Sequence, residues 1–553
     1  MANEITIKIS GEAGQGMQTI GAVLCQIFKK AGYHIFANQD YMSRIRGGNN
    51  FFQIRVSDVP LFTLRKKADI FAALDKKKFN ISESDDIFFD VPLHDIATRI
   101  GGSDIFINTV SCGLILGMMG IEFGQLEQVI RETFADKGDE IVKKNIEAAK
   151  AGYDYAAANL KKDRFKLKTH EPKNTLLMNG NDAIALGAIR AGCKFYTGYP
   201  MTPSTDIMNM IAHYAGKFNI VVEQAEDEIA AINMALGASF AGARSMTGTS
   251  GGGFALMVEG LSLAGMTETP VVIVDAQRPA PATGFPTRTE QADLDFLIHA
   301  GHGEFARVVY APGTIEEAFY LTIKAFNVAE KYQIPVLIMT DQHLADSYRN
   351  VEPFDLNKIK VERSIISRED SKRVSNYKRY QFTESGVSPR AVPSWISDVI
   401  YVDSDEHNEE GHITEDADIR VKMVEKRFYK KMAALSEEVE TPTAYNTDKA
   451  EIVLAGYGST YGVMKEACES SKTGKIGFMH LSQVWPFPSK KVTEVLKNAK
   501  KIVTVENNAA GQFARLMRRE SGLKASESVL RFDGRPFDLD YLNMCLTRLV
   551  LPD

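Results

Sequence analysis

Cysteine is scarce in this sequence. The 553 residues include only five cysteines, which are Cys25, Cys112, Cys193, Cys468 and Cys545, and they form no C-x-x-C pair. Scattered cysteines of this kind argue against a disulfide framework, a zinc ribbon or an iron–sulfur cluster held within the chain.

Long apolar runs and an excess of positive charge are also missing. The most apolar windows, residues 110–121 and 271–274, are too short or too interrupted to cross a bilayer. The first ten residues, MANEITIKIS, lack the basic stretch and apolar run of a signal peptide, so we expect a cytoplasmic protein without a membrane partner. The formal net charge of −6 is a poor match to a nucleic-acid-binding protein.

The length suggests three or four domains at roughly 150 residues each, and the pattern divides the chain into four segments. Residues 1–165 and 446–553 show α/β character. Residues 175–350 alternate short apolar strands with helices, which predicts a parallel sheet covered on both faces. Residues 351–445 are polar with few periodic elements, so we expect an extended linker or insert there.

Several elements can be placed from periodicity. In the first segment, an alternating strand at 5–10 leads through a glycine-rich turn into a helix, and a long helical pattern starts at Leu126. Further strands are predicted at 51–56, 70–74, 87–91 and 104–110. The second segment predicts strands at 194–197, 220–222, 244–249, 270–275, 307–310 and 335–340. The last predicts strands at 452–456, 476–480 and 501–505.

Four loops of the second segment follow predicted strands, at residues 198–204, 223–228, 248–253 and 276–279. Parallel strands end at one edge of a sheet, so these loops should meet in one crevice. Their polar residues each allow a simpler interpretation. Thr202 and Ser204 could cap a helix. Thr249 and Ser250, with three glycines after them, either let a ligand approach the backbone or form a plain turn. Arg278 could grip a carboxylate or be an ordinary surface arginine.

Glu228 stands apart from the acidic cluster around it. Acidic residues favour the first turn of a helix, and this preference explains most of the cluster formed by Glu223, Glu226 and Asp227. Glu228, however, borders a face of small residues that should pack tightly, so it is the carboxylate expected to be buried.

Other motifs are weak. The loop GEAGQG at 11–16 suits either an anion at a helix N-terminus or a tight turn packed under a sheet, and it matches neither a Walker A sequence nor the dinucleotide fingerprint. Glu406, His407 and His412 could suggest a metal site, yet a solvated loop is the favoured interpretation. No GDG signature for magnesium diphosphate is present.

Taken together, the loops resemble the alpha subunit of the 2-oxoacid:ferredoxin oxidoreductases, in the fused gamma–alpha form of the 2-oxoglutarate:ferredoxin oxidoreductases. The resemblance covers nearly the whole chain. GEAGQG (11–16) and IRGGN (45–49) resemble the gamma domain. The other matching runs are TGYPMTPS (197–204), EDEIAAINMALGASFAGARSMTGTSGGGFALM (226–257), QRPAPATGFPTRTEQADL (277–294), YKRYQFTESGVSPR (377–390) and ENNAAGQFARLM (506–517). Met201 stands where the family usually has isoleucine.

The resemblance implies a multidomain α/β protein with an N-terminal gamma domain, a pyrimidine-binding domain of the thiamine diphosphate enzymes, and a C-terminal domain like that of transketolase. It implies thiamine diphosphate shared with a separate beta subunit, which supplies the diphosphate and Mg²⁺ site and a [4Fe-4S] cluster. Coenzyme A as co-substrate, ferredoxin as acceptor, and a heterotetramer of two gamma–alpha and two beta chains are also implied.

The resemblance also assigns residues. Glu228 matches the catalytic carboxylate that hydrogen-bonds N1′ of the aminopyrimidine, and Thr249 and Ser250 match the loop beneath that ring. Thr202 and Arg278 match positions that hold the 1-carboxylate of the substrate. No metal ligand is assigned to this chain.

The substrate is harder to predict. A distal carboxylate, as in 2-oxoglutarate, needs a second cation because burying it unpaired is costly. Arg44, Arg46 and Arg288 are candidates, with a solvated basic turn as the alternative for Arg44 and Arg46.

Other functions stay open at this point. Pyruvate or another 2-oxoacid could be the substrate. A non-catalytic subunit that holds a nucleotide or coenzyme A is a second alternative. A dinucleotide oxidoreductase is the weakest, because the expected G-x-G-x-x-G is missing.

Overall fold

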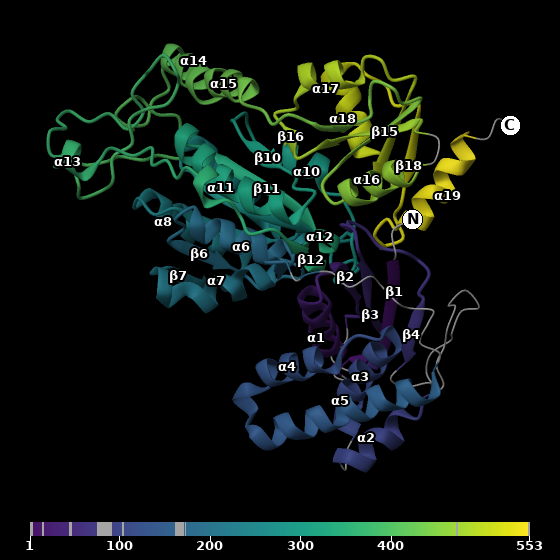
Figure 1. Cartoon of the computed structure of the whole chain (residues 1–553). Helices are drawn as coiled ribbons and strands as arrows, with labels where there is room; N and C mark the ends of the chain where they lie inside the picture. The colour runs from purple at the N-terminus through teal and green to yellow at the C-terminus, as the bar shows by residue number, and fades with distance from the viewer. Residues whose placement is uncertain are drawn as a thin grey trace. The chain divides into compact units, whose positions relative to one another are not determined.

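The computed structural model describes residues 4–13, 16–43, 47–73, 91–101, 104–160, 171, 173–471 and 474–550. Its contacts divide the chain into two compact units (Figure 1). The first unit comprises Met1–Asn179, Asp346–Pro353 and Phe537–Asp553. The second comprises Gly180–Ala345 and Phe354–Pro536. The chain therefore returns to the first unit twice, whereas the division into four segments stays a prediction.

The first unit is built on a mixed six-stranded sheet of order β4-β1-β3-β2-β12-β5. Its strands are β1 (Glu4–Ala13), β2 (His34–Asp40), β3 (Gly47–Ser57), β4 (Ile70–Ala73), β5 (Leu176–Met178) and β12 (Tyr348–Val351). β1 pairs antiparallel with β3 and parallel with β4. The predicted strands at 5–10, 51–56 and 70–74 are thus confirmed, whereas β2 was not predicted.

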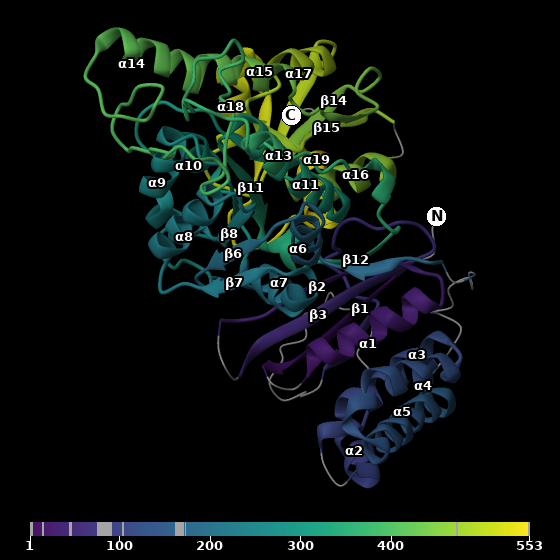
Figure 2. The same cartoon turned by 90° about the vertical axis from the view of Figure 1, so that its left-hand side faces the viewer.

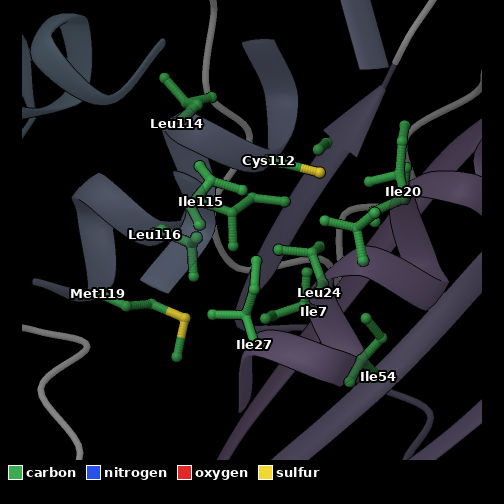
Figure 3. Packing of buried hydrophobic residues seen from close by; sticks show 14 of the residues in the cluster. Ile7, Ile20, Leu24, Ile27, Ile54, Cys112, Leu114, Ile115, Leu116 and Met119 are labelled. Atoms are coloured by element: carbon green, nitrogen blue, oxygen red, sulfur yellow. The ribbon is translucent and has the colours of Figure 1, made fainter. Parts of the chain in front are cut away.

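This unit also contains helices, of which α1 lies along β1 and β3 (Figure 2). They are α1 (Met17–Lys30), α2 (Leu93–Gly101), η2 (Asp104–Phe106), α3 (Ile107–Met119), α4 (Phe123–Thr133), η3 (Ala135–Lys137), α5 (Asp139–Asn159) and α19 (Leu539–Val550). Side chains of α1, α3, β1 and β3 point toward one another in a buried core (Figure 3). At the end of the chain, Arg65 pairs with Asp540 at 3.0 Å.

The strand predicted at 104–110 is wrong, because these residues form η2 and the start of α3. Nearly every residue of α3 is buried, so apolar side chains occur on all sides of the helix. Its sequence therefore shows no helical period. The long helix predicted from Leu126 is two helices, α4 and α5. The strand predicted at 87–91 lies outside the described residues except for Val91.

The second unit contains a seven-stranded sheet of order β16-β10-β11-β9-β8-β6-β7. The strands are β6 (Phe195–Gly198), β7 (Val221–Gln224), β8 (Ser245–Thr249), β9 (Val271–Gln277), β10 (Val308–Tyr310), β11 (Pro335–Asp341) and β16 (Gln483–Trp485). All are parallel except β16, which pairs antiparallel with β10. The six strands predicted for this segment are confirmed.

Helices cover both faces of the seven-stranded sheet, as expected for parallel strands. They are α6 (Gly180–Arg190), α7 (Thr205–Phe218), α8 (Glu228–Phe240), α9 (Gly251–Met266), α10 (Leu294–His299), α11 (Ile315–Tyr332) and α12 (Gln342–Asp346). The side chains of α8, α9 and α10 share one buried core with residues 450–517 of the same unit.

The C-terminal part of this unit has its own sheet of order β13-β15-β14-β17-β18. Its elements are β13 (Thr443–Tyr445), β14 (Ile452–Tyr457), α16 (Thr460–Ser470), β15 (Ile476–Leu481), α17 (Ser489–Leu496), β17 (Lys501–Glu506), α18 (Gln512–Ser521) and β18 (Glu527–Leu530). The three strands predicted here are confirmed. Within the described residues, no helix is long and apolar enough to cross a membrane.

Residues 354–442 are more ordered than the sequence suggested. They contain η5 (Leu356–Lys358), α13 (Arg368–Ser371), α14 (Ala417–Val424), the π-helical turn η6 (Glu425–Lys430) and α15 (Lys431–Glu437). In Figure 1 this stretch loops away from α11 through α13 before α14 and α15 return. The solvated-loop interpretation of Glu406 and His407 is wrong, since Glu406 pairs with Arg427 at 2.8 Å and His407 is fully buried.

Buried ion pairs explain why this polar stretch is ordered. The Glu268 carboxylate accepts from Lys426 and Lys431, and all three side chains are buried. Burial works against the charge of Glu268, but Lys426, Lys431 and Arg379 together hold its pKa below its usual value. The charges of this stretch therefore serve as partners in the interior, which composition alone does not reveal.

Candidate active site

Four loops of the second unit meet at one edge of its sheet. β9, β8, β6 and β7 are neighbours in that order and run parallel, so the loops that follow them leave from the same side. The predicted convergence of residues 198–204, 223–228, 248–253 and 276–279 is confirmed. Crevices at such edges are where open α/β sheets bind ligands.

Glu228 begins α8 and is 3% exposed. Its neighbour Asp227 is the residue that caps the helix, since its carboxylate accepts a hydrogen bond from the amide of Ala230 at 2.7 Å. Glu223 and Glu226 are exposed. The Oε1 atom of Glu228 is buried, and it has no hydrogen-bond partner within the described ranges. A buried carboxylate oxygen without a partner is costly, which marks this atom as one kept for a ligand.

Thr249 and Ser250 connect β8 to α9, and both are buried. Ser250 occupies the N-cap position of α9 but makes no capping hydrogen bond, and its Oγ has no partner in the described part of the chain. The hydroxyl of Thr249 points toward the sulfur of Met201 at 3.8 Å. The loops after β6 and β8 therefore touch at these two side chains.

The glycines after Ser250 leave room beside these polar atoms. A Cβ placed on Gly253 would lie 2.1 Å from the Thr249 hydroxyl and 2.3 Å from Oε1 of Glu228. On Gly252 the nearest atom would be 3.6 Å away, the carbonyl oxygen of Ala282. Glycine at 253 is thus required for the carboxylate of α8 to reach the start of α9.

Arg278 follows β9 and is half-buried. Its Nη1 donates to the carbonyl oxygen of Thr202 at 2.8 Å, which brings two predicted substrate-binding residues together. Burial lowers the pKa of Arg278, while the Glu228 carboxylate opposes that shift. The guanidinium keeps further donors, which can hold a carboxylate.

The helix-capping alternative for Ser204 is not supported. Ser204 precedes α7, but its hydroxyl donates to the carbonyl oxygen of Met201 at 2.8 Å and caps no amide. The Nδ2 of Asn181 donates to the carbonyl oxygen of Pro203 at 2.9 Å, and the Thr202–Pro203 peptide is cis. These contacts fix the backbone around Thr202.

One buried acid of this region was not predicted. Asp275 lies beside Thr249 across β8 and β9, it is fully buried, and both carboxylate oxygens lack partners in the described parts of the chain. Burial raises its pKa well above the usual value, and nearby Asp293 adds to the shift. The only signal in the sequence was an acid at the end of an apolar strand, VVIVD.

The predicted cations for a distal carboxylate are only partly described. Arg44 and Arg46 lie outside the described residues. Arg288 belongs to the loop that Arg278 begins, and its amide donates to the carbonyl oxygen of Phe285 at 3.1 Å. Among the described residues, no group of three or more His, Cys, Asp or Glu side chains could hold a metal ion.

Comparison with known families agrees with this geometry. Residues 186–426 match the thiamine-diphosphate-binding domain of pyruvate flavodoxin/ferredoxin oxidoreductases. Residues 6–86 and 78–155 match the pyruvate ferredoxin/flavodoxin oxidoreductase family, and residues 450–541 match core domain II of pyruvate:ferredoxin oxidoreductase. The first of these matches contains Glu228, Thr249, Ser250 and Arg278.

Whole-chain relatives decide the family. The 2-oxoacid:ferredoxin oxidoreductase subunit alpha of Sulfolobus sp is 33% identical, over 98% of this chain and 96% of the relative. The chain belongs to the alpha subunits of the 2-oxoacid:ferredoxin oxidoreductases. The 2-oxoglutarate synthase subunit KorA of Methanothermobacter marburgensis, a further relative, is 32% identical over 65% of this chain and 94% of its own.

A solved structure shows the same fold throughout. The 2-oxoglutarate:ferredoxin oxidoreductase from Magnetococcus marinus, with 2-oxoglutarate, coenzyme A and succinyl-CoA bound, matches with a TM-score of 0.92 and 30% identity. The match covers 99% of this chain and 100% of that one. The resemblance inferred from the loop motifs and the multidomain α/β fold are therefore confirmed, and the chain is an oxidoreductase subunit.

Proposed function

We propose that this alpha subunit takes part in the oxidative decarboxylation of 2-oxoglutarate with coenzyme A, which yields succinyl-CoA, CO₂ and reduced ferredoxin. The observation that carries the proposal is the buried, unpartnered Oε1 of Glu228 beside Gly253. The names of the Magnetococcus marinus and Methanothermobacter marburgensis relatives support 2-oxoglutarate over pyruvate.

The residues present fit the pyrimidine half of thiamine diphosphate. Glu228 offers an acceptor for a protonated ring nitrogen, and the side chains of Thr249 and Ser250 lie at the start of α9 beside the glycines. When bound, thiamine diphosphate supplies the carbon nucleophile and the electron sink that decarboxylation of a 2-oxoacid requires. Glu228 would then hold the ring and the proton at its nitrogen, which is a catalytic role.

Arg278 and Thr202 would position the substrate. A guanidinium binds a carboxylate through two parallel hydrogen bonds, and Arg278 is already oriented by its bond to the Thr202 carbonyl. The 1-carboxylate of the 2-oxoacid is the group that suits this pair. For the distal carboxylate we propose Arg44 or Arg46.

Helices α8 and α9 support a partner subunit over this site. Apart from Glu228 and Glu259, both are free of charged residues, yet each exposes apolar side chains to solvent, such as Ile229, Met234 and Leu256. Helices that are apolar all round are normally buried. We propose that a beta subunit covers them and brings the diphosphate and Mg²⁺ site and the [4Fe-4S] cluster, in a heterotetramer of two chains of each kind.

Electrons would leave through that cluster to ferredoxin. A cytoplasmic location is part of the same proposal, because the enzyme needs both coenzyme A and ferredoxin. Pyruvate as substrate remains the second candidate, since three family models that match are those of pyruvate enzymes.

The test is an assay of the co-expressed complex with a beta subunit that carries a GDG motif and clustered cysteines. Viologen reduction that needs 2-oxoglutarate, coenzyme A and thiamine diphosphate is expected. Reduction with pyruvate alone would change the substrate, and a stable complex inert to every 2-oxoacid would favour a scaffold role. Loss of the preference for 2-oxoglutarate in Arg44→Ala or Arg46→Ala supports the distal-carboxylate proposal, and an unchanged preference in both variants contradicts it.

A further inference from the structure

The loop that begins at Arg278 is fixed in shape and reaches the glycine-rich start of α9. The amide of Phe285 donates to the carbonyl oxygen of Pro279 at 3.1 Å, which closes the loop on itself. Gly284 has φ +54°, and a Cβ there would lie 1.6 Å from the Pro279 oxygen, so only glycine fits. The Ala282 oxygen lies 3.6 Å from the position of a Cβ on Gly252. We call residues 279–291 the cover loop.

The far end of the cover loop is tied to the C-terminal part of the same unit by Gln291, which is fully buried. Its Nε2 donates to the carbonyl oxygen of Tyr457 at 3.0 Å, and its Oε1 accepts from the amide of Asn507 at 3.1 Å. Its own amide donates to the Asn507 oxygen at 2.7 Å. Its carbonyl oxygen accepts from the Tyr457 hydroxyl at 2.9 Å and from Nδ2 of Asn508 at 3.2 Å.

All four polar groups of Gln291 are therefore used on residues at the ends of β14 and β17. These strands carry no residue assigned to the active site. The other end of the cover loop is held by the bond from Arg278 to the Thr202 oxygen. The loop thus spans from the substrate-binding pair, past the start of α9, to the C-terminal sheet.

We propose that Gln291 is a positioning residue for substrate binding. By holding the cover loop to the ends of β14 and β17, it keeps Arg278 in place to receive the 1-carboxylate of a 2-oxoacid. The C-terminal α/β part of the unit thereby sets the affinity for substrate without touching it. This inference rests on the proposed function of Arg278.

The test compares two glutamine variants in the co-expressed complex. Gln291→Ala removes the two side-chain bonds that hold the cover loop. Gln512→Ala is the matched control, since its side chain also joins the C-terminal part to this region, through Ala292 at 2.7 Å and Asp295 at 2.9 Å. Both bonds of Gln512 lie beyond the cover loop. The readouts are KM and kcat for 2-oxoglutarate and hydrogen exchange of residues 279–288.

In Gln291→Ala we expect KM to rise about tenfold, because the loss of roughly one to two hydrogen bonds weakens binding by about that factor. The kcat should change less than about threefold. Exchange at the Phe285 amide should become faster. Gln512→Ala should change neither quantity. If Gln291→Ala does not assemble, Gln291→Met keeps the volume and removes the same two bonds.

An equal rise in KM in both variants overturns the proposal, because a general loosening of the C-terminal part would explain it. An unchanged KM in Gln291→Ala also overturns it. If the wild-type complex has no activity with any 2-oxoacid, the proposed function fails instead. The exchange measurement then still decides whether Gln291 holds the cover loop.

Discussion

Gly253 and Glu228 approach so closely that no side chain fits between them. A Cβ on Gly253 would lie 2.3 Å from Oε1 of the carboxylate, a separation that real Cβ contacts do not show. Gly253→Ala should therefore displace Glu228 and lower 2-oxoacid oxidation by at least about 100-fold, a loss typical of a disturbed catalytic group. The measurement is the viologen assay of the purified complex.

The control for this prediction is Gly252→Ala. It makes the same change one residue earlier in α9, where a Cβ meets its nearest neighbour at an ordinary 3.6 Å. Activity should stay within about twofold of the wild type, as for an unstrained surface change. Similar losses of activity in both variants would contradict the prediction, because the close approach of Gly253 to Glu228 would then not explain the loss.

The buried carboxylate of Glu228 should also lower the free energy of unfolding of the chain when no partner or ligand is bound. Because its Oε1 is buried without a partner in the described structure, Glu228→Gln removes a charge whose burial is unfavourable. We expect the free energy of unfolding of the chain expressed alone to rise by about 1 kcal/mol. Urea unfolding measures this change, and a fall in stability would mean that Glu228 has a structural partner.

Glu330 should behave in the opposite way. Its buried carboxylate pairs with Arg244 at 2.9 Å, Arg363 at 3.0 Å and Arg390 at 3.1 Å. Glu330→Gln leaves these arginines without their counter-charge, so the free energy of unfolding should fall by about 3–5 kcal/mol in urea unfolding.

The matched control for Glu330 is Glu438→Gln, at the residue that follows α15. Glu438 pairs with Lys331, and both side chains are nearly half exposed. Removing an exposed pair should cost less than about 1 kcal/mol. Equal losses in the two variants would contradict the distinction between buried and exposed pairs.

Much of the site could be predicted because parallel strands bring their following loops together. The small-residue face beside Glu228 predicts that this carboxylate is buried, and the motif runs indicate the family. Asp275 and Gln291 were missed, because their importance lies in burial and in partners far away in the sequence. The first residues of α3 predict a strand for a different reason, because a helix buried on all sides shows no helical period in its sequence.

Stability should decrease in acid because of His480. Burial lowers the pKa of this ring to about 4, and its Nε2 is hydrogen-bonded to the carbonyl oxygen of Gly458 at 2.9 Å. The unfolded chain, with a histidine pKa near 6.5, binds a proton between pH 6.5 and 4 that the folded chain excludes. The contribution of His480 is therefore complete above pH 6.5 and is lost as the pH falls toward 4, by about 2 kcal/mol at pH 5.

Urea unfolding at pH 7.5 and pH 5 checks this expectation. The loss of stability between the two pH values should be about 2 kcal/mol smaller in His480→Gln than in the wild type. His213→Gln, at an exposed position on α7, should leave the loss unchanged. A pH dependence that is the same in all three proteins would contradict the assignment to His480.

The catalytic role of Glu228 is tested most directly by the release of CO₂ from 2-oxoglutarate labelled at C1 in a single turnover. It compares the wild-type complex with Glu228→Gln at equal, measured occupancy of thiamine diphosphate. The wild type should release CO₂ rapidly and the variant at least about 100-fold more slowly, with the complex still assembled. Equal rates in the two complexes would contradict the catalytic role of Glu228.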